Sequence, residues 1–403
     1  MNNNFPPNII GFDLNLSDIC NLTCDFCYTK GGCKKAYSEE RVQKTFEWFF
    51  KQYQIGQTNR AHVTFYGGEP LIEFEHIKHI VQEQSQIAKS KNINMVFSIV
   101  TNMTLADEEK ILWCKQNRVG IHPSIDGCEE AQNMYRKFKN GEGSANIVYK
   151  NAKILLREMP GRSCRMTVGP QTVQYTAKSI KFVCEELGFR TVNAILAGGV
   201  LWTDSQLEIF KEQITDVTNW WLDQMRQNKH YSLYHIRNML DGMRRGTRRK
   251  KLCPSGTSRV GIDSDGNLWP CHRFCNYRTD TRFKLGTIYE GYTNQQVFEQ
   301  INNYDLYEAN KEKCKNCRAQ ISCHALCMHE SLEAYGELFR FTDHYCKVWP
   351  FYWDMACVVK DIMVKEKNQL FKKLYIDPPP PPAQIYTCRN CKNFEPKKLN
   401  KLF

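Results

Sequence analysis

The sequence has no long apolar run and no export signal. No apolar stretch approaches the ~20 residues that a helix needs to cross a bilayer, and the N-terminus lacks the basic region and apolar core of a secretory signal. The densest basic run, Arg244–Lys251, has no aromatic residues interleaved with it, as a nucleic-acid recognition motif would. These absences argue against a membrane protein and disfavour a nucleic-acid-binding one.

Cysteine and positive charge are abundant instead. The chain has 403 residues, 19 cysteines and a formal net charge of +12. A chain of this length can bury a sizeable core without disulfides, and its cysteines gather in C-x2-C-type groups, which is typical of metal ligation in a reducing, cytoplasmic setting. The run Arg244–Lys251 is typical of a solvated face, or of a docking surface for an acidic peptide. A zinc-rich nucleic-acid-binding protein is the alternative from a different class.

Three cysteines near the N-terminus have the most informative spacing. Cys20, Cys24 and Cys27 form a C-x3-C-x2-C run. A cubane [4Fe–4S] cluster normally takes four thiolates, so three would leave one iron open to a ligand that is not protein. A structural zinc site, which takes four ligands, or three unconnected thiols are the alternatives that this spacing leaves open.

The first half of the chain alternates strand-like and helix-like segments. Ser38 has the features of a helix N-cap, because Glu39 and Glu40 follow it. The alternation predicts parallel strands joined by helical crossovers. Six such units predict an α/β fold with an open or partial (β/α)6 barrel, whose active site lies at the C-terminal ends of the strands. The expected strands are 11–16, 62–66, 95–101, 119–126, 165–168 and 191–196, and the expected helices are 39–53, 73–90, 106–116, 145–158, 177–187 and one from 204.

The second half is cysteine-rich and irregular. A turn at 263–267 predicts a hairpin between 260–262 and 268–269, and a helix is expected at 343–371. The prolines at 378–382 predict a stiff spacer before a basic tail, where Cys388 and Cys391 supply only two of the four ligands of a zinc site. The expected domains are a core at 9–230, a basic helical linker at 231–252, a cysteine-rich domain at 253–350, a C-terminal helix at 351–377 and a tail at 378–403.

The turn Gly67-Gly68-Glu69-Pro70 directly follows the second expected strand. Glycine lets a backbone approach a ligand closely, and a carboxylate complements an ammonium group. Together with the cysteine triad and the strand–helix alternation, this turn resembles the radical S-adenosylmethionine (SAM) superfamily. The resemblance implies that the open iron binds the amino and carboxylate groups of SAM, and that an electron from the cluster cleaves SAM to a 5′-deoxyadenosyl radical.

The resemblance also implies contacts with SAM. Tyr28 lies where the family often has an aromatic near the adenine, and Gly67, Gly68, Glu69 and Pro70 match its amino-group motif. Ser124 either contacts the ribose or carboxylate end of SAM or is a plain serine at a strand end. Arg136 either binds the carboxylate of SAM or forms a surface salt bridge. The remaining expected contacts are Asn102, Asn193 and Leu196.

A second ordered set of cysteines resembles the SPASM extension, which holds two auxiliary [4Fe–4S] clusters in radical SAM enzymes that modify peptides and proteins. The set reads Cys253-x12-Gly266-x4-Cys271, then Cys314-x2-Cys317-x5-Cys323-x3-Cys327 and Cys346. Carried over by resemblance, Cys314, Cys317, Cys323 and Cys346 bind an outer cluster, and Cys253, Cys271 and Cys327 an inner one. The fourth inner ligand is Cys275, or that cluster has an open iron for a substrate thiol.

The resemblance covers about residues 9–350 and implies an enzyme that crosslinks or oxidises a ribosomally made peptide or protein. A maturase that forms formylglycine in a sulfatase is the alternative, and Asp343 is a candidate base. A reductant such as flavodoxin or ferredoxin, and a peptide substrate with an acidic leader, are the expected partners, without nucleic acid or membrane. The first strand begins so early that leader recognition is expected to need a separate protein or the basic surface.

Overall fold

The computed structural model describes residues 8–29, 37–53, 60–246, 253–276, 281–323 and 327–378. Its contacts divide the chain into two compact units. Unit 1 comprises Met1–Ile125, Gln132–Arg162 and Pro254–Tyr304, and unit 2 comprises Asp126–Ala131, Ser163–Cys253 and Asp305–Phe403. The contacts therefore split the expected 253–350 domain after Tyr304, and its two parts belong to different units.

Unit 1 is built on an eight-stranded sheet with the order β11-β10-β9-β8-β1-β2-β3-β4. Four strands of the first half are parallel, namely β1 (Gly11–Asn15), β2 (Arg60–Tyr66), β3 (Asn94–Thr101) and β4 (Gly120–Pro123). The expected hairpin is present as β8 (Arg259–Ile262) and β9 (Asn267–Trp269), and β10 (Gly286–Thr287) and β11 (Gly291–Tyr292) continue it. Because β8 pairs in parallel with β1, the cysteine-rich half extends the sheet of the first half.

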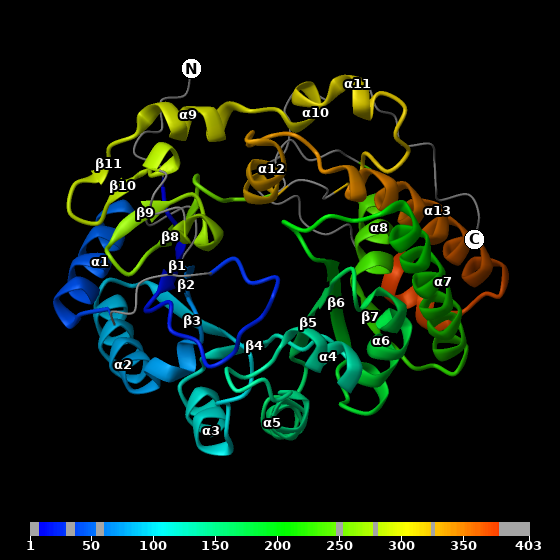
Figure 1. Cartoon of the computed structure of the whole chain (residues 1–403), viewed down its shortest axis with the longest axis horizontal. Helices are drawn as coiled ribbons and strands as arrows, with labels where there is room; N and C mark the ends of the chain where they lie inside the picture. Colours follow the sequence, from blue (N-terminus) through cyan, green and yellow to red (C-terminus); the bar gives the residue numbers. More distant parts are fainter. Residues whose placement is uncertain are drawn as a thin grey trace. The chain divides into compact units, whose positions relative to one another are not determined.

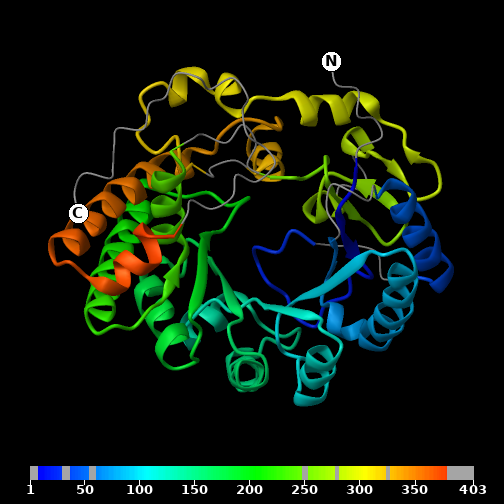
Figure 2. The ribbon, with the colours of Figure 1, turned by 180° about the vertical axis from the view of Figure 1, so that it is seen from behind.

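Alternation along β1 explains how this sheet is covered. Phe12 and Leu14 are fully buried, and the ring of Phe12 lies 5.4 Å from Phe46 and 5.0 Å from Phe49 of helix α1 (Glu39–Gln52). Helices α1, α2 (Phe74–Ser90) and α3 (Glu108–Gln116) lie on the same face of β1–β4 in both views (Figures 1 and 2). The expected N-cap is confirmed, because the side chain of Ser38 accepts a hydrogen bond from the Arg41 N–H.

Unit 2 contains a three-stranded parallel sheet in the order β5-β6-β7. Its strands are β5 (Ser163–Val168), β6 (Thr191–Leu196) and β7 (Ser232–Leu233), and its main helices are α6 (Thr176–Glu185), α7 (Asp204–Arg226), α8 (Tyr234–Arg245), α12 (Met328–Tyr335) and α13 (Asp343–Lys365). Helix α13 packs against α7 and α8 (Figure 1). Most of the expected basic linker at 231–252 is thus β7 and α8.

The remaining elements are short or follow the expected pattern. They are α4 (Glu129–Tyr135), α5 (Ala145–Glu158), α9 (Gln295–Asn303), α10 (Leu306–Ala309), α11 (Lys311–Cys314), α14 (Gln369–Phe371), the 3-10 helices Pro70–Glu73, Val173–Tyr175, His272–Asn276 and Thr281–Phe283, and the π-helix Lys372–Ile376. Cys388, Cys391 and most of the proline spacer lie outside the described residues. No helix in the described ranges is long and apolar enough to cross a membrane.

Candidate radical SAM site and cysteine pocket

The cysteine triad lies in the loop that follows β1 in unit 1. Cys20, Cys24 and Cys27 are half-buried and free of disulfides. The backbone turns tightly, with the Cys27 N–H donating to the Cys24 carbonyl at 3.0 Å. The N–H groups of Leu22 and Thr29 each donate to a triad sulfur at 3.4 Å, to Cys20 and Cys27 respectively. Hydrogen bonds to sulfur are characteristic of Fe–S ligands, so this donor set fits a cluster bound by thiolates.

The two glycines of the Gly67-Gly68-Glu69-Pro70 turn pack against the backbone that leads into the triad. The N–H of Gly68 donates to the Ser17 carbonyl at 2.9 Å, and that of Glu69 to the Ile19 carbonyl at 2.8 Å. A Cβ on Gly68 would lie 2.1 Å from the Ile19 oxygen, and one on Gly67, whose φ is +136°, would lie 2.2 Å from the Ser17 oxygen. Close approach to the triad loop therefore requires both glycines, in addition to any role toward a ligand.

Glu69 joins the ends of β2 and β3. Its side chain is 1% exposed. One carboxylate oxygen accepts from the Leu71 N–H at 3.1 Å and from the Thr101 hydroxyl at 2.7 Å, and the other accepts from the Asn102 N–H at 2.7 Å. Burial raises the pKa of Glu69 to about 7, although these bonds and the charge of Arg136 oppose the shift.

Asn102 connects the end of β3 to the triad loop. Its side-chain amide donates to the Asn21 side-chain oxygen at 3.0 Å and lies 3.7 Å from the Cys20 sulfur. Asn21 in turn donates to the Thr104 hydroxyl at 2.8 Å. Ser124, half-buried after β4, joins the same strand end, because its N–H donates to the Thr101 carbonyl at 2.9 Å.

Arg136 contacts the triad loop at Phe26. It is 7% exposed, and its guanidinium carbon lies 5.3 Å from the centroid of the Phe26 ring, over its face. The next residue, Lys137, accepts from the Thr23 N–H at 2.8 Å through its carbonyl. A surface salt bridge, the plain alternative for Arg136, does not describe this buried position.

A network that the sequence reasoning missed connects the triad loop to the segment of Cys271. The His272 Nδ1 lies 2.8 Å from an Asp13 carboxylate oxygen, and the His272 ring stacks on Tyr66 at 4.0 Å. Tyr28 lies 5.8 Å from the same imidazole, ring to ring. Burial would raise the pKa of Asp13, but the hydrogen bond and charge of His272 and the charge of Arg259 outweigh it, and the pKa is lowered.

The signal for this network was present in β1. Asp13 and Asn15 are polar residues at alternate positions of an otherwise apolar strand, and both are buried. Buried polar side chains require partners, so their periodicity predicts a polar network on that face. The partners themselves could not be predicted, because Arg259 and His272 come from the far half of the chain.

The expected inner ligands are divided between the two units, with Cys271 and Cys275 in unit 1, and Cys253 and Cys327 in unit 2. Cys271 is half-buried, whereas Cys275 is fully buried and its thiol lies 3.7 Å from the Cys271 carbonyl oxygen, to which it donates. The ligand role of Cys275 stays a prediction.

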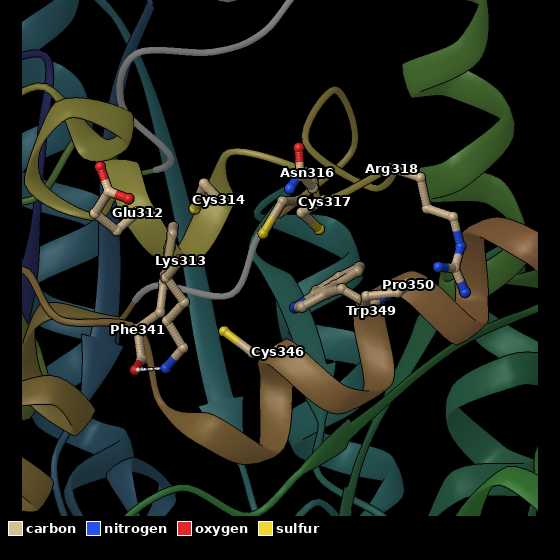
Figure 3. Close-up of a pocket in the computed structure, with 11 residues that line it drawn as sticks. Glu312, Lys313, Cys314, Asn316, Cys317, Arg318, Phe341, Cys346, Trp349 and Pro350 are labelled. Atoms are coloured by element: carbon tan, nitrogen blue, oxygen red, sulfur yellow. Dashed lines mark hydrogen bonds between the residues drawn. The ribbon is translucent and has the colours of Figure 1, made fainter.

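The four expected outer ligands line one pocket of unit 2. Its volume is about 400 Å³, and Figure 3 shows Cys314, Cys317 and Cys346 around it, with Trp349 beside them on α13. Cys323 also lines it. Among the described residues, no three Cys, His, Asp or Glu side chains converge closely enough to hold a metal ion. The donor set itself, four cysteines lining one pocket, has the number of thiolates that either a [4Fe–4S] cluster or a structural zinc ion takes.

The remaining expected site residues belong to unit 2. Asp343 is 65% exposed in its side chain and pairs with the Lys313 ammonium at 2.5 Å, and this hydrogen bond lowers the Asp343 pKa, which makes it a weak base. The Asn193 side-chain oxygen accepts from Arg237 at 3.1 Å. Leu196 accepts from the Tyr345 hydroxyl at 3.3 Å through its carbonyl and lines a cavity of about 130 Å³. The roles proposed for these three residues stay predictions.

Comparison with known proteins shows which family and which relatives this chain is similar to. Residues 14–183 match the model of the radical SAM superfamily. The chain is 24% identical over 331 residues to a cysteine-type anaerobic sulfatase-maturating enzyme of Clostridium novyi, covering 77% of this chain and 85% of that protein. It is also 24% identical over 263 residues to the sporulation killing factor maturation protein of Bacillus subtilis, covering 65% of this chain and 60% of that protein.

A solved structure shows the same fold. The enzyme anSMEcpe with bound AdoMet and the Cp18Cys peptide superimposes with a TM-score of 0.70 at 18% identity, covering 87% of this chain and 99% of that one. This likeness confirms the expected α/β fold class of radical SAM type. The matching family model covers residues 14–183 of the 403, which identifies a radical SAM domain in this part of the chain.

Proposed function

We propose that this enzyme uses SAM to modify a ribosomally made peptide or protein by hydrogen abstraction, forming a crosslink or an oxidised residue. The observation that carries the proposal is the triad loop. Two of its sulfurs accept hydrogen bonds from backbone N–H groups, and its backbone packs directly against Gly67 and Gly68. The named relatives, which are maturation enzymes for a sulfatase and a sporulation killing factor, support a peptide or protein substrate. When bound, a [4Fe–4S] cluster with SAM on its open iron supplies the reductive cleavage that yields a 5′-deoxyadenosyl radical.

The residues around the triad would hold SAM. Arg136 provides a buried cation for its carboxylate, and the Gly67–Pro70 turn provides backbone and carboxylate groups for its ammonium. Tyr28 offers an aromatic face for the adenine. Asn102 and Ser124, at the ends of neighbouring strands, offer polar groups for the ribose and carboxylate ends.

Two auxiliary clusters are part of the proposal. The outer one would be bound by Cys314, Cys317, Cys323 and Cys346 around the cysteine pocket. The inner one would be bound by Cys253, Cys271 and Cys327, with Cys275 or a substrate thiol on the fourth iron. Oxygen-sensitive clusters fit a reducing, oxygen-poor cytoplasm, and their reduction needs a reductant such as flavodoxin or ferredoxin. The substrate would be a peptide whose acidic leader binds a basic surface of this protein.

A sulfatase maturase is the second candidate. The Clostridium novyi enzyme favours it, because the alignment covers 85% of that enzyme's length. The two candidates differ in product: a crosslink removes two hydrogen atoms from the peptide, whereas formylglycine replaces the cysteine side chain by an aldehyde.

The test is SAM cleavage by the anaerobically reconstituted enzyme under dithionite. We expect 5′-deoxyadenosine from the wild type and none from Cys24→Ala, with Cys114→Ala, a fully buried thiol outside the site, as the control. Equal 5′-deoxyadenosine from wild type and Cys24→Ala would refute the proposal. Mass spectrometry of a sulfatase-derived peptide and of a short cysteine-rich peptide encoded beside the gene separates the two candidates.

A further inference from the structure

The parallel sheet of unit 2 carries a small cavity at one end of β6. Its volume is about 130 Å³, and Ala194, Ile195 and Leu196, the last three residues of the strand, line it. β7 pairs with β6 only at Thr191 and Val192, so β6 extends past β7 on this side. In open parallel sheets, ligands bind outside the carboxyl ends of the strands. The cavity therefore lies where such a sheet places a ligand.

Two helices complete the walls of the cavity with aromatic rings. The rings come from the first residue of α8 and from α13, namely Tyr234, Tyr345, Trp349 and Tyr352. Within unit 2, α8 packs against β6, and α13 packs against α8 (Figure 1). The ring of Trp349 lies 5.5 Å from that of Tyr352 and 6.2 Å from that of Tyr234, edge to face in both pairs. Aromatic rings favour this arrangement, so the walls of the cavity are well packed.

The cavity is apolar. None of the described residues that line it is Asp, Glu, Lys or Arg. The Leu196 carbonyl accepts a hydrogen bond from the Tyr345 hydroxyl at 3.3 Å. His235 stacks on Tyr352 at 5.4 Å and is 2% exposed, and burial lowers its pKa to about 3, so this imidazole is neutral at pH 7. A charged group would lose its hydration here without gaining a partner, so the cavity favours an uncharged apolar group.

The size of the cavity fits a single side chain. Pockets that hold whole small molecules have volumes of about 300–1,000 Å³, so this cavity is too small for SAM or for a peptide segment. A dry cavity of about 150 Å³ lined by apolar side chains binds benzene, and one phenyl ring or one branched aliphatic group would therefore fill this one. Ile195, Tyr234 and Tyr345 are only half-buried, whereas the other lining residues are buried, so access from the surface is beside these three.

The loop that follows β6 exposes apolar side chains. Leu201 is 94% exposed. The Trp202 indole N–H donates to the Ala197 carbonyl at 3.1 Å, and its ring lies 6.4 Å from that of His344, the neighbour of Tyr345 in α13. The loop thus offers an apolar surface next to the helical turn that carries Tyr345. Such a surface suits the residues on either side of a side chain that enters the cavity.

We propose that this cavity, which we call the β6 pocket, binds one uncharged apolar side chain of the peptide substrate, of the size of leucine or phenylalanine. The inference rests on the proposed function only in assigning that side chain to a peptide substrate. No bond is made or broken in the β6 pocket, so it contributes affinity and selectivity and takes no part in the chemistry.

The test measures the binding of single blocked amino acids to the full-length holoenzyme by saturation-transfer difference NMR, without SAM or reductant. The probes are the N-acetyl amides of leucine, phenylalanine, tryptophan, lysine and glycine, together with adenosine. We expect binding of the leucine and phenylalanine probes. The tryptophan probe is too large, the lysine probe is charged and the glycine probe has no side chain, so these three should give no more than background.

Two variants change the volume of the β6 pocket in opposite directions. Ala194→Leu adds three carbons at its wall, and we expect the leucine probe to bind about tenfold more weakly, because the apolar space is already filled. Ala334→Leu makes the same change at an exposed position of α12 and is the matched control. Tyr234→Ala enlarges the pocket and should gain binding of the tryptophan probe, a result that misfolding cannot produce.

The β6 pocket is refuted if the leucine and phenylalanine probes do not bind, if the lysine or glycine probe binds equally well, or if Ala194→Leu binds like the wild type. An equal loss of binding in Ala334→Leu also refutes it. Adenosine that binds more tightly than the leucine probe, and is lost in Ala194→Leu, would assign the cavity to the adenine of SAM instead. Dithionite-driven 5′-deoxyadenosine formation is measured separately and tests the proposed function alone. Because the probes need no SAM, either result can fail without the other.

Discussion

Glu69 combines nearly complete burial with a raised pKa, which makes its effect on stability depend on pH. Its pKa rises from 4.5 to about 7 on folding because burial disfavours the carboxylate. Between these two values the folded state binds more protons than the unfolded state, so the free energy of unfolding falls as pH rises from about 4.5 to about 7. The upper limit of this loss is about 3 kcal/mol.

We expect Glu69→Gln to remove this part of the pH dependence in the cluster-free protein. Between pH 5 and about pH 7 the urea midpoint of the wild type should fall, whereas that of the variant should lack this fall, because only the wild type carries the cost of a buried charge. Glu109→Gln, an exposed carboxylate in α3, should follow the wild type. Parallel curves for the wild type and Glu69→Gln would show that Glu69 does not titrate in this range.

Adding one methyl group at Gly68 should displace the backbone of the triad loop. A Cβ would lie 2.1 Å from the Ile19 carbonyl oxygen, so the loop that leads to Cys20 must move in Gly68→Ala. We expect this variant to lose the iron of the triad cluster and SAM cleavage. Gly161→Ala is the control, because its Cβ would meet no atom within 4 Å and the strain of its φ of +81° is only about 1–2 kcal/mol. Normal iron and activity in Gly68→Ala would disprove the requirement for close approach.

Among the elements, strands and helices with local signals were predicted well, and nonlocal contacts were not. The helix Ala145–Glu158 and the strand Thr191–Leu196 have the bounds that periodicity predicts. The strand expected at 119–126 ends at Pro123. The helix expected to reach 371 ends at Lys365, and Lys367 has a φ of +51°, which a helix does not allow. The pairing of β8 with β1 has no local signal, because it depends on partners far apart in the chain.

The pairing of β8 with β1 creates a buried ionic contact that can be tested. The Arg259 Nε donates to Asp13 at 2.8 Å and a guanidinium nitrogen donates to the Thr64 hydroxyl at 2.6 Å. In Asp13→Asn, Arg259 loses its buried counterion and His272 its charged partner, so we expect a loss of about 3 kcal/mol of unfolding free energy at pH 7. Glu109→Gln again provides an exposed control, and a loss below about 0.5 kcal/mol, typical of surface changes, would contradict the network's importance.

At the scale of the whole molecule, cysteine spacing and contact units give different divisions of the chain. Spacing groups residues 253–350 as one module, whereas the contacts join Pro254–Tyr304 to unit 1 and place the outer-pocket cysteines in unit 2. Spacing reports which thiols could share a cluster, but it carries no information on which sheet a segment extends. The candidate triad site was therefore predictable from local motifs, while the Asp13–His272 network, which crosses the module boundary, was not.

The outer pocket allows the auxiliary cluster to be separated from the triad cluster. Cys346 lines the pocket, and Cys357, three turns further along α13, does not. We expect Cys346→Ser to lose iron equivalent to one cluster and to stop peptide modification, yet still to form 5′-deoxyadenosine with dithionite, because the triad lies in unit 1. Cys357→Ser should keep full iron and product formation. Since a cluster that has lost a thiolate binds its iron less firmly, full iron in Cys346→Ser would place the outer ligand elsewhere, and loss of 5′-deoxyadenosine would show that the triad cluster depends on this pocket.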